Sequence, residues 1–215
     1  MFNFKIYFMS EQSPLSLGTE DIKKLLMRYA VPAIVAMTAA SLYNMMDSIF
    51  IGHGVGALGI AGLAVTFPFI NLAAAFGSLV GVGASTLVSV KMGQKDLKSA
   101  EAVLGNVLLL NTVIGFLFMT VCLIFLDPIL YFFGASADTL PYARDYMKVI
   151  LYGNLITHIY MGLNEVMRAS GYPQRAMMAT LFAVLINGVL NALFIFVLDM
   201  GIKGAALGTI CAQFL

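Results

Sequence analysis

The chain has 215 residues, of which 60% are hydrophobic and 11% are charged. Soluble domains contain about 45–50% apolar and about 25% charged residues, so this composition excludes an ordinary soluble domain and predicts a membrane protein. The 12 Lys and Arg residues nearly balance the 11 Asp and Glu residues. Because no excess of positive charge is available, we expect no nucleic-acid partner.

The N-terminal residues do not read as a secretory signal. The stretch from Met1 to Met9 has a single Lys and no small-residue cleavage site, and Met9 is an alternative initiator. We expect residues 1–18 to form a cytoplasmic tail and residues 19–215 to form one transmembrane lobe. Thr19, followed by two acidic residues, predicts the N-cap of the first helix.

Uncharged runs locate the membrane spans, since each span needs about 20 apolar residues. The first span covers 29–51 and includes Asp47, and the glycine-rich Gly52–Gly56 is predicted to be the loop after it. A long helix over 60–90 follows. The later runs are 102–126, 149–164, 176–198 and, ending with the chain, 204–215. The sequence therefore predicts an all-α membrane protein with five complete transmembrane helices and the start of a sixth.

The positive charges divide unequally between the two sides of these spans. One side holds Lys5, Lys23, Lys24, Arg28, Lys91, Lys95, Lys98, Arg168 and Arg175, and the other holds Arg144, Lys148 and Lys203. By the positive-inside rule the first side is cytoplasmic. This distribution predicts a multi-pass protein of the cytoplasmic membrane with a cytoplasmic N-terminus.

The helix predicted over 60–90 has two features that bear on packing. Pro68 removes one backbone hydrogen bond and is the expected kink point. Ala73, Gly77 and Gly81 recur every four residues, a stripe of small side chains that allows close approach of another helix.

Polar side chains inside the spans are costly and are therefore candidates for function. Asp47 lies in the first span, Asn187 and Asn191 stack one turn apart in the fifth, and Thr209 lies in the sixth. By helical rise, Asp47, Asn191 and Thr209 lie about 6, 10 and 9 Å from the outer boundary. Such an all-oxygen set suits a monovalent cation or a proton. The alternatives are an Asp that reaches interfacial water and an Asn pair that only joins helices.

The fourth span carries Asn154, His158, Asn164 and Glu165, with Arg168 at its cytoplasmic end. The spacing predicts contacts of Arg168 with Asn164 and Glu165, and an ion pair of structural importance is the simpler interpretation of the latter. His158 lies at mid-depth, where a lone histidine is either a satisfied core group or a proton-coupling group. His53, in the glycine-rich loop, is expected to be solvated.

The sequence gives little support for an enzyme. It contains no HExxH, GxSxG or Walker A pattern, and its glycine runs lie in or beside membrane spans. We therefore expect neither catalytic residues nor a cofactor other than Na⁺ or H⁺ as a coupling ion.

Six segments in order are similar to those of a known family, the MATE (multidrug and toxic compound extrusion) transporters. The chain from about Thr19 onward resembles their N-terminal lobe. The segments are Val31-Pro32, Asp47-Ser48-Ile49-Phe50-Ile51-Gly52, Gly83–Ser89 before Lys91-Met92-Gly93, Arg168-Ala169-Ser170-Gly171, Asn187-Gly188-Val189-Leu190-Asn191 and Gly201–Thr209.

The resemblance implies a secondary antiporter of twelve helices in two similar lobes, driven by Na⁺ or H⁺ and exporting organic cations, drugs or other amphipathic toxic compounds. It also implies that Asp47 is the coupling residue of this lobe. The implied cation site, a metal site if Na⁺ is the ion, draws on Asp47, Asn187, Asn191, Ala205 and Thr209. Candidates for the substrate cavity are Tyr43, Asn44, Met161 and Asn164. Pro32 and Pro68 are the predicted hinges.

The chain departs from the family pattern in three respects. Some relatives carry an acid at the position of Asn191, so the site here has one carboxylate and the choice between Na⁺ and H⁺ stays open. Relatives often have Asn at the position of Met161. A full transporter also needs roughly twice this length, which indicates either a fragment or a half that pairs with a second, C-terminal lobe.

Two other functions fit an all-α membrane chain. A lipid-linked precursor flippase of the same superfamily would line its cavity with cationic side chains for phosphates. Here the positive residues clear of Asp or Glu lie at cytoplasmic helix ends, which disfavours that function. A non-transporting membrane scaffold would tolerate Asp47→Asn without loss.

Overall fold

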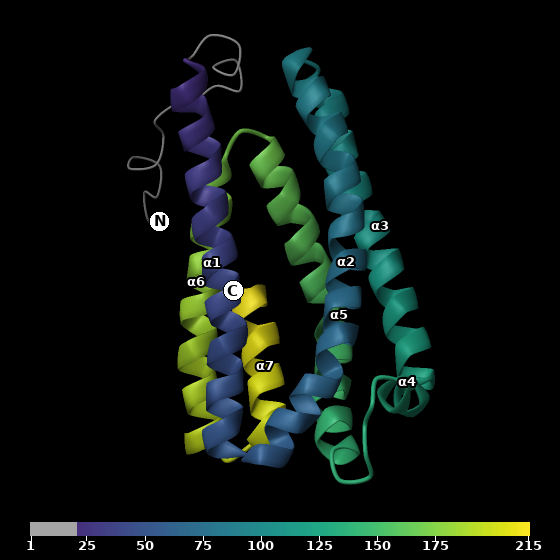
Figure 1. Cartoon of the computed structure of the whole chain (residues 1–215). Helices are drawn as coiled ribbons and strands as arrows, with labels where there is room; N and C mark the ends of the chain where they lie inside the picture. Colours follow the sequence, from purple (N-terminus) through teal and green to yellow (C-terminus); the bar gives the residue numbers. More distant parts are fainter. Residues whose placement is uncertain (1–20) are drawn as a thin grey trace, which may run out of the picture.

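The computed structural model describes residues 21–215, which form a bundle of long helices (Figure 1). The predictions for Thr19 and for residues 1–18 fall outside this range. In chain order the helices are α1 (Ile22–Gly54), α2 (Ala57–Gly93), α3 (Leu97–Ile124), α4 (Leu126–Phe132), α5 (Leu140–Ala169), α6 (Pro173–Ala192), the short π-helix η2 (Leu193–Val197) and α7 (Gly201–Phe214). The predicted all-α fold is confirmed.

The long helices run up and down between two ends of the bundle (Figure 1). One end, here called the basic end, has the start of α1 and the α2–α3 and α5–α6 connections. It holds Lys23, Lys24, Arg28, Lys91, Lys95, Lys98, Arg168 and Arg175. The opposite end has the α1–α2, α3–α5 and α6–α7 connections, with Arg144, Lys148 and Lys203. Each Lys and Arg within 21–215 thus lies on the side to which the charge pattern assigned it.

The connection between α1 and α2 is shorter than the sequence suggested. α1 continues through Gly54, so most of the predicted loop Gly52–Gly56 is the last turn of a helix. His53 is exposed in this turn, with its Nδ1 2.9 Å from the carbonyl oxygen of Ile49. Gly56 has a φ of 94°, which glycine adopts without a Cβ clash, and the chain reverses there.

The start of α1 and both boundaries of α2 also differ from the predicted helix boundaries. The N-cap of α1 is Asp21, whose carboxylate accepts a hydrogen bond from the Lys23 N–H at 3.0 Å. α2 is longer at both ends than the predicted 60–90 and contains Pro68. Figure 1 shows that α2 is bent in the part nearest α1, as the loss of a backbone hydrogen bond predicts.

The small residues of α2 pack directly on α5, as their spacing predicted. A Cβ atom on Gly81 would lie 2.8 Å from the Cα of Gly162, so the two backbones are in contact. One turn away, a Cβ on Gly77 would lie 3.4 Å from the Cα of His158. Ser89 donates to the carbonyl oxygen of Ala169 at 3.0 Å, which ties the two helices at the basic end.

α5 is the central helix, and this position explains its polar sequence. Length and hydropathy identify four candidate membrane spans, which are α1, α2, α3 and α6 with η2. α5 is more polar, but it contacts α2, α3, α6 and α7 and therefore has little surface that must face lipid. The predicted span 149–164 is the middle of this helix of 30 residues.

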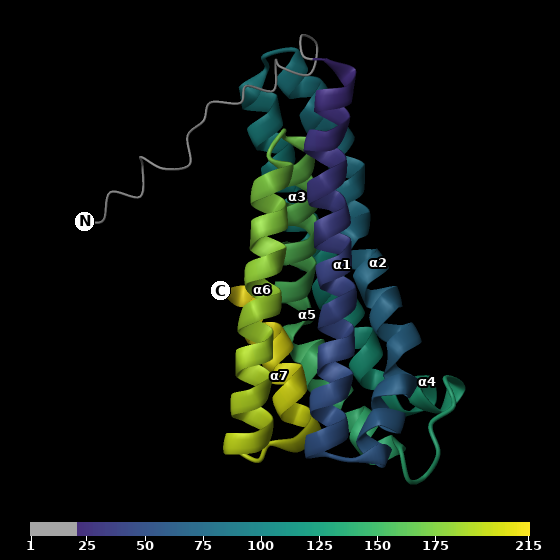
Figure 2. The same cartoon turned by 60° about the vertical axis from the view of Figure 1, so that its left-hand side comes forward.

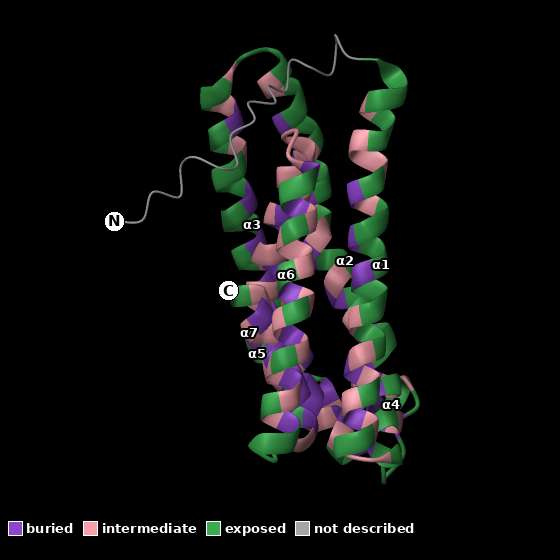
Figure 3. Ribbon diagram, turned by 90° about the vertical axis from the view of Figure 1, so that its left-hand side faces the viewer, coloured by how far each residue is buried: buried purple, intermediate pink, exposed green. Residues whose placement is uncertain are grey.

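The helices form two groups that α5 and α7 join. α1 packs mainly on α6, whereas α2 and α3 pack on each other and on α5. Figure 3 shows buried residues concentrated between the helices and toward the opposite end. The predicted fifth span, 176–198, corresponds to α6 and η2, and the sixth run, 204–215, corresponds to α7.

Candidate functional site

Asp47 is buried on a helix that is otherwise largely exposed. Only 4% of Asp47 is accessible, and it shares the buried side of α1 with Pro32, Ala36 and Ala39. Pro32 lies inside the helix, four turns before Asp47. The small residues on this side let α6 approach, so that the carboxylate lies against another helix. The burial of Asp47 disfavours the alternative of an Asp that reaches interfacial water.

Asn187 and Asn191 of α6 supply the neighbours of this carboxylate. Both side chains are completely buried. The Asn191 amide nitrogen donates to Asp47 Oδ1 at 2.5 Å and lies 3.1 Å from the Asn187 side-chain oxygen. The predicted stacking of the two amides is thus confirmed, and both face α1.

Thr209 of α7 closes the same layer. It is 8% exposed, and its hydroxyl donates to the backbone oxygen of Ala205 at 3.2 Å. The hydroxyl oxygen also accepts a bond of 3.5 Å from Asn187. The structure therefore brings together Asp47, Asn187, Asn191, Ala205 and Thr209 from α1, α6 and α7, which the spacing alone could not show.

The Asn187 amide has two useful orientations in this layer. With nitrogen toward Asp47, it donates to Oδ1 over 3.1 Å while its oxygen accepts from the Thr209 N–H over 3.2 Å. With oxygen toward Asp47, it accepts from Asn191 as above, and its nitrogen lies 3.4 Å from the Tyr43 hydroxyl. Rotation of one amide group thus changes whether Asp47 faces a donor or an acceptor.

Gly208 makes room for Asn191. A Cβ atom at Gly208 would lie 2.4 Å from the Asn191 side-chain oxygen. This oxygen is buried and has no hydrogen-bond partner among the residues described. The π-helix η2 begins two residues after Asn191, and such local changes of helical register are frequent at functional sites. Gly208 and η2 are features of the site that sequence reasoning missed.

A cavity of about 300 Å³ opens beside the layer. Tyr43, Asn44 and Met161, three of the predicted cavity residues, line it together with Asp47. Other lining residues that the sequence analysis did not single out include Phe67, Tyr146, Thr157, Tyr160, Thr180 and Gln213. Asp47 is the one charged side chain among the lining residues that the structure describes.

The lining residues of α5, most of which the sequence analysis did not assign to the cavity, carried a usable signal. Tyr146, Ile150, Asn154, Thr157 and Met161 follow one another at spacings of three or four residues, which places them on one face of a helix. The Thr157 hydroxyl donates to the Gln213 oxygen at 2.6 Å and joins this face to α7. The charge-free run was too short to reveal that α5 begins before residue 149.

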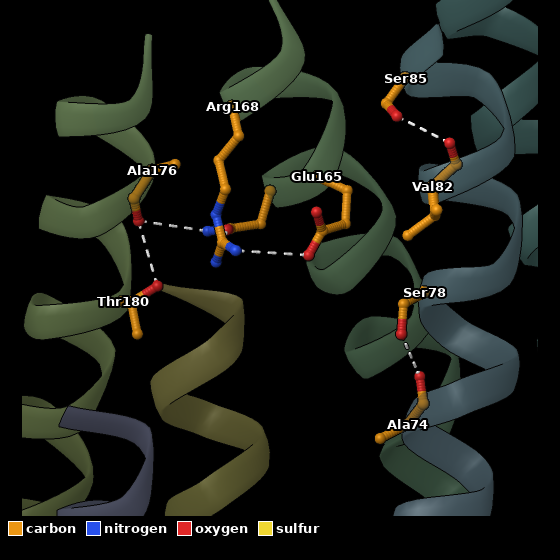
Figure 4. Close-up of polar contacts among 9 residues, drawn as sticks. Ala74, Ser78, Val82, Ser85, Glu165, Arg168, Ala176 and Thr180 are labelled. Carbon is orange, nitrogen blue, oxygen red and sulfur yellow. Dashed lines mark hydrogen bonds and ion pairs between the residues drawn. The ribbon is translucent and has the colours of Figure 1, made fainter. Parts of the chain in front are cut away.

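Asn164 does not line the cavity with Asp47. It lines a separate pocket, donates to the Ala176 oxygen at 3.3 Å and accepts from Arg168 at 2.9 Å. Arg168 also pairs with Glu165 at 3.6 Å (Figure 4). The predicted contacts of Arg168 are therefore confirmed, and they fasten the α5–α6 turn. Thr180 donates to the same Ala176 oxygen at 3.1 Å (Figure 4).

His158 is a second buried polar side chain, away from Asp47. His158 is fully buried, with Nδ1 2.9 Å from the Asn154 carbonyl oxygen and the ring centroid 6.0 Å from that of Phe118. A backbone carbonyl only accepts, so Nδ1 carries the hydrogen. His158 thus lies in the α2–α3–α5 seam, and it does not line the cavity.

Comparison with known proteins identifies the family. The MatE family model matches residues 32–193. Curated relatives include the multidrug export protein MepA of Staphylococcus haemolyticus and that of Staphylococcus aureus. Each is 29% identical over 201 residues, which is 94% of this chain and 44% or 45% of the relative. The chain thus spans less than half the length of the curated relatives it matches.

Solved structures give the same result. A multidrug resistance MATE family transporter in an outward-facing conformation superposes with a TM-score of 0.86 at 28% identity, covering 94% of this chain and 44% of that one. A MATE in a bent conformation superposes with a TM-score of 0.85, also at 28% identity, covering 93% and 44% of the two chains. The chain therefore belongs to the MATE family of membrane transporters and corresponds to the N-terminal half of its members.

Proposed function

We propose that this lobe binds the coupling ion of a cation-driven exporter, H⁺ or Na⁺, at Asp47, with Asn187, Asn191 and Thr209 and the backbone oxygen of Ala205 beside it. The observation that carries the proposal is a carboxylate that is 4% exposed and has amide and hydroxyl neighbours but no ion pair among the described residues. An ionised carboxylate in such a place is costly, and binding a proton or a cation removes most of that cost.

The two orientations of Asn187 fit the two occupancies of this site. An ionised, empty Asp47 favours the amide nitrogen, which donates to it over 3.1 Å. A protonated Asp47 can donate to the amide oxygen in the other orientation, and Na⁺ would be coordinated by both oxygens. Asn187 contacts the Thr209 backbone N–H of α7 in the first orientation, and the hydroxyls of Thr209 and of Tyr43 of α1 in the second. Ion binding is therefore coupled to contacts between helices.

We propose that the cavity beside Asp47 holds an amphipathic or cationic substrate. The cavity of about 300 Å³ is bordered by Tyr43, Tyr160 and Met161, and one carboxylate lies in its wall. Aromatic and Met side chains adapt to varied apolar groups, and the carboxylate complements a positive charge. Because ion and substrate share Asp47, binding of one lowers the affinity for the other, which is the differential affinity that exchange requires. The names of the relatives, multidrug export proteins, agree with such substrates.

The flippase alternative is not favoured. A cavity for a lipid-linked phosphate needs cationic side chains. Neither Lys nor Arg is among the residues that line the cavity within 21–215.

The same proposal includes the orientation of the lobe in the membrane and its pairing with a C-terminal lobe. The basic end would face the cytoplasm of a multi-pass plasma-membrane protein, as the positive-inside rule predicts. A second, C-terminal lobe would face the cavity, because transporter sites of this plan lie between repeats. Pro32 and Pro68, both inside helices, would be the points at which α1 and α2 bend between states.

Efflux of ethidium from loaded cells tests the proposal, using the natural full-length reading frame. External Na⁺ and pH are varied separately for the wild type and for Asp47→Asn. We expect Asp47→Asn to reduce efflux about tenfold or more and to remove its dependence on one of the two ions.

A matched control makes the same chemical change elsewhere. Asp138→Asn alters an exposed acid at the same end of the bundle, outside the cavity, and should leave efflux unchanged. Wild-type levels of ion-dependent efflux from Asp47→Asn, at equal amounts of protein in the membrane, would contradict the proposed role of Asp47.

A further inference from the structure

The short helix α4 follows a break in α3 that the sequence explains. Pro128 has no N–H and would clash with the carbonyl of Ile124, so α3 ends at that residue and a new helix starts at Leu126. α4 turns away from α3 and projects from the side of the bundle at the lower end of α3 (Figures 1 and 2). It ends at Phe132, and Gly134, two residues later, has a φ of 96°. The sequence analysis did not single out this segment.

α4 has one face on the protein and one face away from it. Leu126 and Leu130, one turn apart, are 4% and 0% exposed and belong to the main hydrophobic core. Tyr131 and Phe132 are 54% and 84% exposed. The outward face is therefore aromatic, and the inward face fixes its position.

The charge of α4 is neutralised on the protein side. Asp127 is the one charged residue of this helix, and both of its oxygens accept hydrogen bonds from Arg144 of α5, one at 2.7 Å from Nε. The Asp127–Arg144 pair holds α4 against the start of α5. The exposed aromatic face thus carries no net charge.

The exposed face of α4 continues the lipid-facing flank of α3. Along α3, the residues Phe116, Leu117, Val121 and Ile124 are between 45% and 69% exposed, and Phe125 beyond it is 53% exposed. α3 is apolar enough to span a membrane. Exposed apolar side chains therefore continue along the chain from a helix that can span a membrane onto α4, where Tyr131 and Phe132 follow the end of that helix.

We propose that α4 is an interfacial anchor, with Tyr131 and Phe132 inserted at the headgroup–acyl boundary of the lipid leaflet at the opposite end of the bundle. Aromatic side chains are favoured at this depth, and a helix with one apolar face lies in the plane of the interface. The partner is the phospholipid bilayer. Because the outward face is uncharged, its insertion should not depend on anionic lipid.

A tryptophan reporter tests this placement. The 215 residues contain no Trp, so Phe132→Trp introduces a single one, in a full-length background from which any Trp of the other half has been removed. Phe116→Trp, on the same flank but about 12 Å further along α3 from Ile124, is the deep reference. Both proteins are reconstituted in phosphatidylcholine vesicles with bromines near the headgroup or near the chain ends, with and without phosphatidylglycerol.

We expect Trp fluorescence of Phe132→Trp to fall at least twofold with the shallow bromines and less with the deep ones. Phe116→Trp should show the reverse order, and phosphatidylglycerol should change neither. Strong quenching of Phe132→Trp by aqueous iodide without quenching by bromolipid would overturn the proposal, because α4 would then lie in water. Quenching by neither would also overturn it and would indicate that another protein segment covers α4.

Discussion

Asn191 of α6 donates a hydrogen bond of 2.5 Å to Asp47 of α1, although 144 residues separate them in the chain. Both side chains are buried. This contact links the carboxylate of α1 directly to α6, and the Asn187 amide lies beside it. A donor at this place stabilises the ionised carboxylate and leaves the site with a single negative charge.

Asn191→Asp should therefore strengthen binding of a metal cation. Two carboxylates in contact attract Na⁺ more strongly than one, and at most one of them is neutralised by a single proton. We expect the Na⁺ concentration for half-maximal ethidium efflux to fall about tenfold, or a Na⁺ dependence to arise where the wild type has none. The readout is efflux from loaded cells at fixed pH. A variant that remains folded and shows unaltered ion dependence would argue that Asn191 does not border the ion.

Gly208→Ala should disturb the same layer through packing alone. The added methyl would lie 2.4 Å from the Asn191 side-chain oxygen, so Asn191 or α7 must move. Overpacking of this kind costs about 1–3 kcal/mol. We expect a lower melting temperature in detergent and at least a fivefold loss of efflux, since the amide no longer faces Asp47 as before.

The control for this variant is Gly105→Ala, because nothing lies within 4 Å of its added methyl on α3. It should retain wild-type efflux and melting temperature. Equal behaviour of the Gly105 and Gly208 variants would show that the close approach of Asn191 to α7 is unimportant for transport.

The sequence predicted the depth of the polar side chains along their spans, but it did not predict which helices pack against each other. Helical rise alone placed Asp47, Asn191 and Thr209 in one layer, and the structure joins them. Spacing could not show that α1, α6 and α7 are adjacent, because hydropathy constrains each span separately and packing partners depend on shape. For the same reason Gly208 was not recognised as a contact of Asn191.

Helix boundaries were predicted poorly where charge was the only guide. α5 begins at Leu140, well before the predicted residue 149. The prediction started too late because Arg144, Asp145 and Lys148 lie inside the helix and interrupt its uncharged run. Arg144 and Asp145 are satisfied by Asp127 and Lys203 respectively at the membrane edge. Charges paired at a helix end are compatible with the helix, so they do not mark its limit.

Gly81→Ala should destabilise the α2–α5 contact. Its methyl would meet the Cα and the carbonyl oxygen of Gly162 at 2.8 and 2.9 Å, and backbone atoms cannot rotate away. We expect the helices to separate and the melting temperature to fall by several degrees, for a cost of about 1–3 kcal/mol. Thermal unfolding in detergent, followed by circular dichroism, measures the change.

Gly83→Ala is the matched control on the same helix, two residues away. Nothing lies within 4 Å of its methyl, and Gly83 is exposed. Because Ala is the better helix former, this variant should be as stable as the wild type or slightly more stable. An equal loss of stability in the Gly83 variant would contradict the backbone contact as the cause of the Gly81→Ala effect, because a methyl on Gly83 meets nothing within 4 Å.

Asp96 should give the start of α3 a pH-dependent stability. It is the N-cap of α3, and hydrogen bonds from the hydroxyl and backbone N–H of Ser99 lower the pKa of its carboxyl, with a further contribution from Lys91 at 3.6 Å. A pKa that is lower in the folded state contributes stability above the unfolded value of about 3.9, and this contribution is lost as the pH falls through the folded value. Asp96→Ala should therefore melt at a lower temperature than the wild type at about pH 7, and this difference in melting temperature should narrow toward pH 3.

Asp96→Asn, which can cap without charge, should lose the pH dependence but keep part of the stability. A gap between wild type and Asp96→Ala that stays constant across this range would mean that the charge of Asp96 contributes nothing to the cap.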